Sequence, residues 1–207
     1  MAYSDEFLGY LELKQDLLFN KIPPEARKSY ITQALEIGQE AASQVSTASI
    51  TRLYEQASIK IVKVEKSGQL FKTKLRAQYE EGPNHTAKVT YYKESIENLA
   101  RSGGLSYDQA LKIHLAHEFF HYWEMEKATP VNEQLAKVKL TKVFGWQRYG
   151  TILRTSEIAA NAFTKAFLKL PFLPNLYDYQ YLMTTKELPA DWLTQAHAAY
   201  QDEVGEN

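Results

Sequence analysis

Residues 115–127 read LAHEFFHYWEMEK, a stretch that combines histidines and glutamates with large apolar side chains. A helix that contains it has local signals for both of its ends. Ser106 and Gln109 have the spacing of a capping box, in which each side chain binds the other residue's backbone amide. Pro130 cannot continue a helix. The sequence therefore predicts one helix from about residue 107 to residue 127, with HEFFH in its second half.

The HEFFH motif places two histidines and a glutamate on one turn of this helix. Positions i and i+4 lie about 40° apart around a helix axis, so His117 and His121 would project side by side. Glu118 is turned by about 100° from His117, which suits a general base beside an ion rather than a ligand. This is the arrangement of an HExxH metal site. The alternative is a pair of solvent-facing histidines beside an ordinary surface glutamate.

A catalytic zinc site needs a third protein ligand, and several residues could supply it. His114 lies on the same helix, where a row of histidines cannot surround an ion, while His85 lies in an expected turn and His197 in the last expected helix. An acid on a second helix is the better candidate. Glu157 and Asn161 share one helical face among alanines, where an unpartnered carboxylate would be costly to bury. We therefore expect Glu157 to be the third ligand.

The elements around this helix indicate an α+β fold. Apolar periodicity predicts helices before it at 4–20, 25–45 and 46–58. Alternating or β-branched runs then predict a small antiparallel three-stranded sheet, with strands at 59–65, 69–80 and 87–93. The order is N-terminal helices, sheet, and then a helical core that carries HEFFH and a second ligand helix.

Further elements are expected after Pro130. A helix is predicted over 131–143, followed by an aromatic loop at 145–150. The ligand helix should begin near Thr155 and end before Pro171. An irregular tyrosine-containing stretch and a final helix over 190–203 complete the prediction.

The composition limits the classes of function. The chain has 207 residues, a formal net charge of -1 and no cysteine, so disulfides and cysteine-ligated zinc sites are excluded. No basic field or nucleic-acid module is present, and the Lys72, Lys74 and Arg76 row is best explained as the solvated face of a strand. Because neither a signal peptide nor a run of about 18 apolar residues occurs, we expect a cytoplasmic protein without a membrane or nucleic-acid partner.

HEFFH followed by EIAANAF at 157–163 resembles the ImmA/IrrE-type zinc metallopeptidases, which pair HExxH with a downstream ExxAN segment. The resemblance extends over residues 50–171. It implies a zincin-like core with His117, His121 and Glu157 as zinc ligands and Glu118 as the catalytic acid and base. It also implies a supporting role for Asn161 and a protein substrate, which in this family is typically a transcriptional repressor.

We expect the chain to divide into an N-terminal helical extension, 1–47, and a metallopeptidase-like domain, 48–207, which together form one compact unit. Further residues could support the ligands or stabilise the transition state; the candidates are His114, Tyr149, Arg154 and His197. The strand AKVTYY at 87–92 is the expected edge strand that would align a substrate.

Two hypotheses follow for function. The first is a zinc-dependent peptidase that acts on a protein or peptide, with Mn²⁺ or Fe²⁺ also compatible with two histidines and one carboxylate. The second is a regulatory protein that keeps the metallopeptidase fold and binds a partner without cutting it. The presence of Glu118 favours the first, because a binding protein needs no base beside the metal. The sequence leaves the oligomeric state open.

Overall fold

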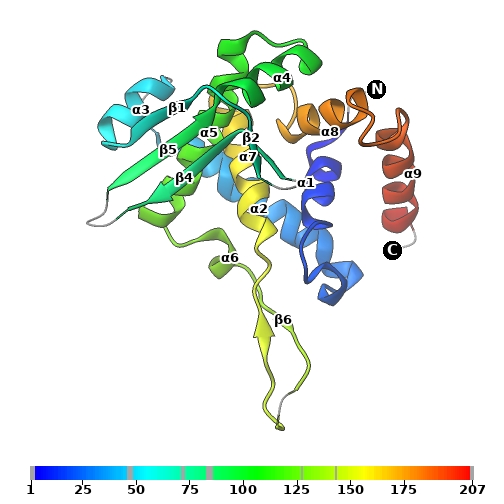
Figure 1. Ribbon diagram of the computed structural model, residues 1–207. Coiled ribbons are helices and arrows are strands. Elements are labelled where there is room, and N and C mark those ends of the chain that lie inside the picture. Colours follow the sequence, from blue (N-terminus) through cyan, green and yellow to red (C-terminus); the bar gives the residue numbers. More distant parts are fainter. Residues whose placement is uncertain are drawn as a thin grey trace.

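The computed structural model describes residues 3–45, 49–70, 73–82, 86–126, 128–142 and 144–205. A small sheet lies at one side of a helical body, and one hairpin projects from that body (Figure 1). The mixed α+β class is confirmed. None of the described helices combines the length and the apolar character needed to cross a membrane.

Helix α5 (Tyr107–Glu126) is the central element and has the predicted bounds. Its capping box is present, because Ser106 Oγ accepts from the Gln109 amide at 3.1 Å and Gln109 Oε1 accepts from the Ser106 amide at 2.9 Å. Helix α7 (Arg154–Leu168) packs against α5, as the aromatic contact between Phe120 and Phe163 illustrates. These two helices carry all the predicted metal ligands.

The sheet differs from the predicted antiparallel arrangement. Its order is β1 (Lys60–Val64), β5 (Ala87–Tyr92), β4 (Ala77–Glu81), with β1 parallel and β4 antiparallel to β5. The single strand predicted over 69–80 is also wrong, since a small hairpin of β2 (Gly68–Leu70) and β3 (Thr73–Leu75) precedes β4. The sheet is therefore mixed, and β4 and β1 are its edges.

The N-terminal helices belong to the main hydrophobic core. Helix α1 (Asp5–Leu13) is followed by a 3-10 turn (Phe19–Lys21), α2 (Pro24–Gln44) and α3 (Ile50–Gln56). Helix α2 packs along α7 at very short range. A Cβ atom at Gly38 would lie 2.1 Å from the carbonyl oxygen of Ala159, so only glycine allows this approach. Buried side chains from both sides of residue 47 share one cluster, while the division at that residue stays a prediction.

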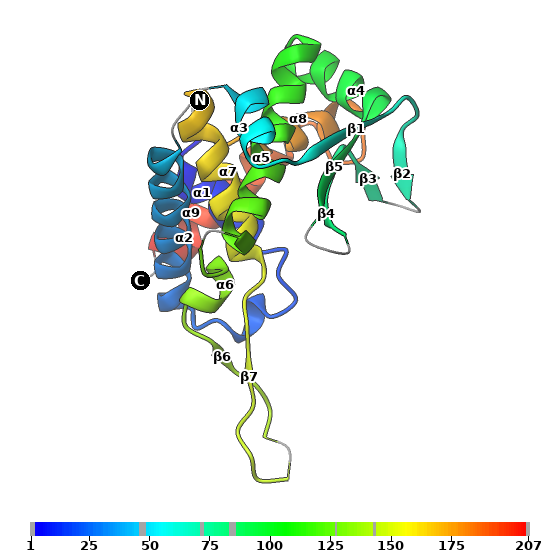
Figure 2. The ribbon, with the colours of Figure 1, turned by 90° about the vertical axis from the view of Figure 1, so that its left-hand side faces the viewer.

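The segment after Pro130 is not the predicted helix. Helix α6 (Val131–Gln134) is a single turn, and the chain then forms a hairpin of β6 (Val138–Lys139) and β7 (Tyr149–Gly150). The hairpin points away from the body in both ribbon views (Figures 1 and 2). Tertiary contacts account for the difference, because Gly150 lies against Leu18 and Leu140 at the base of the hairpin.

The remaining helices cover the other sides of the core. Helix α4 (Lys93–Gly103) follows the sheet, and α9 (Trp192–Gly205) ends the described chain as predicted. The tyrosine-containing stretch predicted to be irregular is instead helix α8 (Asn175–Thr184), with Tyr177, Tyr179 and Tyr181 buried. Asn175 ties α8 to α1 by donating from Nδ2 to the Leu8 carbonyl at 3.0 Å.

Candidate metal centre

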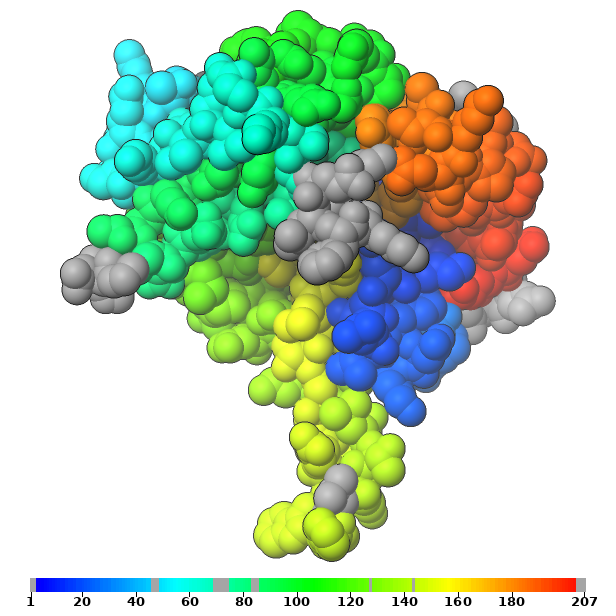
Figure 3. Space-filling view, viewed as in Figure 1, coloured from blue at the N-terminus to red at the C-terminus, as the bar shows by residue number. Residues whose placement is uncertain are grey.

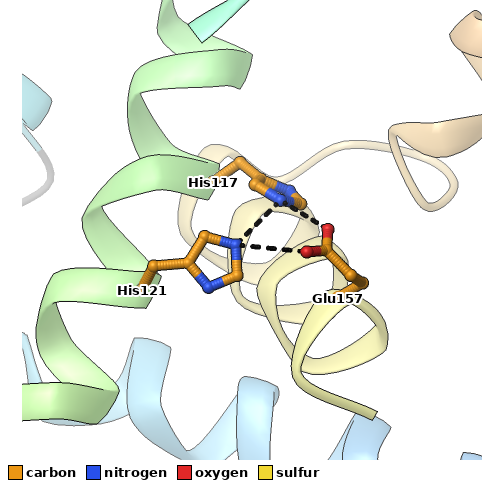
Figure 4. A group of neighbouring side chains, drawn as sticks. All are labelled: His117, His121 and Glu157. Atoms are coloured by element: carbon orange, nitrogen blue, oxygen red, sulfur yellow. Dashed lines mark hydrogen bonds and ion pairs between the residues drawn. The ribbon is translucent and has the colours of Figure 1, made fainter. Parts of the chain in front are cut away.

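His117, His121 and Glu157 point toward one another from α5 and α7 (Figure 4). His117 Nε2 lies 3.3 Å from His121 Nε2 and 3.2 Å from Glu157 Oε2. His121 Nε2 lies 3.7 Å from Glu157 Oε1. The three side chains are partly buried. The predicted ligand set is therefore brought together by two helices that are separated in the sequence by α6 and the β6–β7 hairpin.

These separations fit a metal ion. Two ligand atoms that bind a tetrahedral zinc at about 2.0–2.1 Å are separated from each other by about 3.3 Å. The three measured separations, 3.2, 3.3 and 3.7 Å, are close to that value. Two imidazoles and a carboxylate are also a donor set suited to zinc, Mn²⁺ or Fe²⁺. The cluster could thus hold a metal ion with little rearrangement.

His117 and Glu157 also form an ion pair. Burial favours the neutral form of each group, but the hydrogen bond and the opposite charge of the partner outweigh it. The pKa of His117 is thereby raised to about 9, and the pKa of Glu157 is lowered to about 2. At neutral pH a proton therefore occupies the position where His117 would bind a metal.

A further carboxylate, Glu124, orients His121 through the ring nitrogen Nδ1. Its Oε1 lies 3.0 Å from His121 Nδ1 and accepts from the Ser156 hydroxyl, and its Oε2 accepts from the Val131 amide at 3.2 Å. Burial would raise the pKa of Glu124, but His121 and Ser156 lower it. Ligating histidines commonly bind a carboxylate through their second nitrogen. Sequence reasoning missed this residue, although its position three residues after His121 was a signal for such a pair.

Glu118 lies between the histidines and the edge of the sheet. The Tyr79 backbone amide donates to Glu118 Oε2 at 2.7 Å. The β4 chain segment pairs with β5 through the backbone groups of its even-numbered positions. The Tyr92 amide donates to the Arg76 carbonyl, and the Gly82 amide donates to the Thr86 carbonyl. The outer edge of β4 therefore faces the site. The expectation that AKVTYY would be the edge strand is wrong, because β5 is the central strand.

A pocket of about 670 Å³ opens beside His117, Glu118 and Glu157. Its other walls come from α1, the turn before β4, α8 and α9, and two oppositely charged pairs lie in them. Arg76 pairs with Asp178, and Arg154 Nη1 lies 3.6 Å from Glu12 Oε2. Burial, together with the negative charge of Glu157, raises the pKa of Glu12 to about 7. The pocket thus offers both apolar walls and charges of each sign next to the candidate metal ligands.

The supporting residues predicted from the sequence have different positions. Asn161 lines the pocket and donates from Nδ2 to the Glu157 carbonyl at 2.9 Å, and Arg154 lines it as well. His114 also faces the pocket, and burial, with the charge of Arg76, lowers its pKa well below the usual value, so the ring is neutral. Tyr149 lies exposed on β7, and His197 packs against Phe7 with ring centroids 4.8 Å apart. Neither of these two lines the pocket.

Two sequence predictions lie outside the described residues. These are the assignment of His85 to a turn and the position of Lys72 in the basic row. Arg76 of that row is not a solvated side chain, since it pairs with Asp178 and lies over the Tyr181 ring at 5.2 Å.

No protein-family model, no curated protein and no solved structure matches this chain.

Proposed function

We propose that this protein is a zinc-dependent peptidase. The observation that carries the proposal is the convergence of His117 and His121 with Glu157, while Glu118 lies beside them on the pocket wall. Two imidazoles, one carboxylate and an adjacent base are the parts that metal-assisted hydrolysis requires. The motif resemblance supports the same conclusion and suggests a protein substrate such as a transcriptional repressor.

Each residue has a role in the proposed reaction. The bound ion would supply Lewis-acid activation of a water molecule and of the substrate carbonyl. Glu118 takes a proton from the attacking water and delivers it to the leaving amine. Glu124 keeps His121 in the orientation that turns Nε2 toward His117, where both rings would hold the ion. Asn161 fixes the first turn of α7 and with it the backbone of Glu157.

The edge of β4 is the proposed track for the substrate backbone. An extended peptide can add to an exposed strand edge through main-chain hydrogen bonds. The Tyr79 amide points from this edge toward Glu118, so a peptide aligned there would pass the proposed base. Its side chains would enter the adjoining pocket, whose lining includes the Arg76–Asp178 and Arg154–Glu12 pairs.

The test combines metal analysis with cleavage assays. Elemental analysis of the wild type, Glu157→Ala and Glu118→Gln should find about one zinc per chain in the first and third proteins and little in the second. A mixed peptide library analysed by mass spectrometry should be cleaved by the wild type, and Glu118→Gln should be slower by about 10²–10⁴-fold. Zinc bound by the wild type without any Glu118-dependent cleavage would instead support a partner-binding protein. Absence of metal after zinc is added back would reject the site itself.

A further inference from the structure

The hairpin that leads into α7 forms an arm that projects from the body of the protein. We define the arm by its described residues, 137–142 and 144–150. It extends below the body in the space-filling view (Figure 3) and in both ribbon views. Its base is fixed by buried Val138, and its middle by the Leu140 amide, which donates to the Arg148 carbonyl at 2.8 Å. Gln147 Nε2 also donates to the Leu140 carbonyl at 2.7 Å.

The tip of the arm exposes aromatic side chains. Phe144 is 98% exposed and Trp146 is 80% exposed, on either side of Gly145, whose φ of 83° makes the turn. Tyr149, nearer the base, is 56% exposed. Within the described chain none of the three stacks on another ring. Large aromatic surface left in water at a convex tip indicates a binding partner.

The arm is also basic, in a chain whose formal net charge is only -1. No aspartate or glutamate occurs between Glu133 and Glu157. Within that interval the arm carries exposed cations on both of its strands, and they are Lys137, Lys139, Lys142 and Arg148. In the part of the chain that the structure describes, none of these forms an ion pair. The partner is therefore expected to be negatively charged.

The spacing of aromatic and cationic residues fits one type of partner. Lys139 pairs with Tyr149, three residues from Trp146, and a strand rises about 3.3 Å per residue. Lys139, Lys142 and Arg148 thus lie within about 10 Å of the tip, while Lys137 lies two residues farther back. This distance is close to the depth of about 5–10 Å that apolar groups reach in a lipid interface. Trp and Tyr favour this interface, and Lys and Arg favour anionic headgroups.

We propose that the arm binds an anionic lipid surface, with Phe144 and Trp146 entering the interface and the cations contacting the headgroups. This proposal departs from the sequence-based expectation of no membrane partner, which considered only signal peptides and membrane-spanning segments, because adsorption to a lipid surface needs neither. A convex tip without a stacked ring platform is less suited to single-stranded nucleic acid, which binds in basic grooves lined by aromatics. The proposal is independent of peptidase activity.

Vesicle co-sedimentation of the full chain tests the proposal directly. The probes are vesicles of phosphatidylcholine alone and of phosphatidylcholine mixed with phosphatidylglycerol. The protein should bind the anionic vesicles, and added salt should weaken this binding. Lys139→Gln with Arg148→Gln should lower the affinity by about fivefold for each charge removed, whereas Lys60→Gln with Lys66→Gln should not change it.

Substitutions at the tip test the aromatic contribution. Phe144→Ser with Trp146→Ser should abolish most of the binding and the accompanying shift in tryptophan emission, while Met125→Ser, an exposed apolar residue on α5, should keep both. The proposal is overturned if the wild type ignores anionic vesicles or if the tip and charge variants bind like the wild type. Arm-dependent binding of polyglutamate or of single-stranded DNA, without vesicle binding, would also overturn it and assign the arm to that class of partner.

Discussion

The backbone amide of Tyr79 donates a hydrogen bond to Glu118 Oε2 at 2.7 Å. This bond links the edge of the sheet to the residue proposed as the general base. The strand thus holds the Glu118 carboxylate from one side, while α5 fixes its backbone from the other. A substrate that lies along β4 would reach the base at the same point.

Removal of the Tyr79 amide should slow catalysis without loss of metal. Proline at position 79 has no amide hydrogen. Because the Tyr79 amide points outward from an edge strand, its removal leaves the hydrogen bonds between β4 and β5 intact. A hydrogen bond to a charged group contributes about 1.5–3 kcal/mol, so kcat for peptide cleavage should fall by about 10–100-fold. The matched control is Tyr79→Ala, which keeps the amide. Equal losses in the two variants would show that the ring, and not the amide, matters.

Loss of the Glu124 carboxylate should weaken metal binding. Glu124→Ala frees the His121 ring and removes the acceptor of the Val131 amide, and such partners of ligating histidines typically contribute 10–100-fold to metal affinity, so a decrease of about that size is expected. Competition with a chromogenic chelator measures it. Glu124→Gln should lose less, since it keeps an acceptor, and Glu126→Ala should behave like the wild type. Wild-type zinc affinity in Glu124→Ala would contradict the proposed orienting role.

Metal uptake should release the proton held by His117. The pKa of this residue is raised to about 9 in the metal-free protein, so the ion must displace the proton at neutral pH. Apparent zinc affinity should therefore rise by about tenfold per pH unit from pH 7 toward pH 9. Calorimetry in buffers with different ionisation enthalpies counts the protons released. Affinity that stays constant between about pH 7 and pH 8.5 would exclude a protonated His117.

Glu12 should make the metal-free protein less stable as the pH rises. Its folded pKa of about 7 lies above its ordinary value of 4.5, so the folded state favours the neutral carboxyl. The contribution of Glu12 to the free energy of unfolding is therefore fully present below about pH 4.5. It is lost as the pH rises through about 7, by about 3 kcal/mol in total. Glu12→Gln stays neutral and should escape this loss in urea unfolding at pH 5 and pH 8. The exposed control Glu36→Gln should follow the wild type, and a parallel pH dependence in Glu12→Gln would reject the assignment.

Local sequence signals predicted the parts of the site that depend on one helix. The capping box at Ser106 and Gln109 fixed the start of α5, and the i, i+4 spacing predicted the joint projection of His117 and His121. Glu157 was found because a carboxylate in an alanine-rich helix needs a partner. The proximity of these residues could be predicted because it depends on neighbouring turns of a helix and on the burial cost of a single residue.

The incorrect sequence-based predictions involve contacts between distant segments of the chain. The parallel pairing of Lys60 with Lys88, across a connection whose described part contains three further strands, has no local signal. The segment 131–143 was predicted to be helical, but the contacts of Gly150 with Leu18 and Leu140 favour the hairpin. Tyr79 could be recognised as a partner of Glu118 only after the edge strand was known.

The close approach of α2 to α7 has a consequence for attempts to isolate the metal site. A fragment that begins at residue 48 would contain every residue of the two sequence motifs. It would nevertheless lack the helix on which α7 rests, because Gly38 lies against the Ala159 carbonyl, half a turn beyond Glu157. We expect such a fragment to contain both motifs in its sequence but to lose the position of α7 relative to α5. We therefore expect the metal site to require more of the chain than the segment that contains the two motifs.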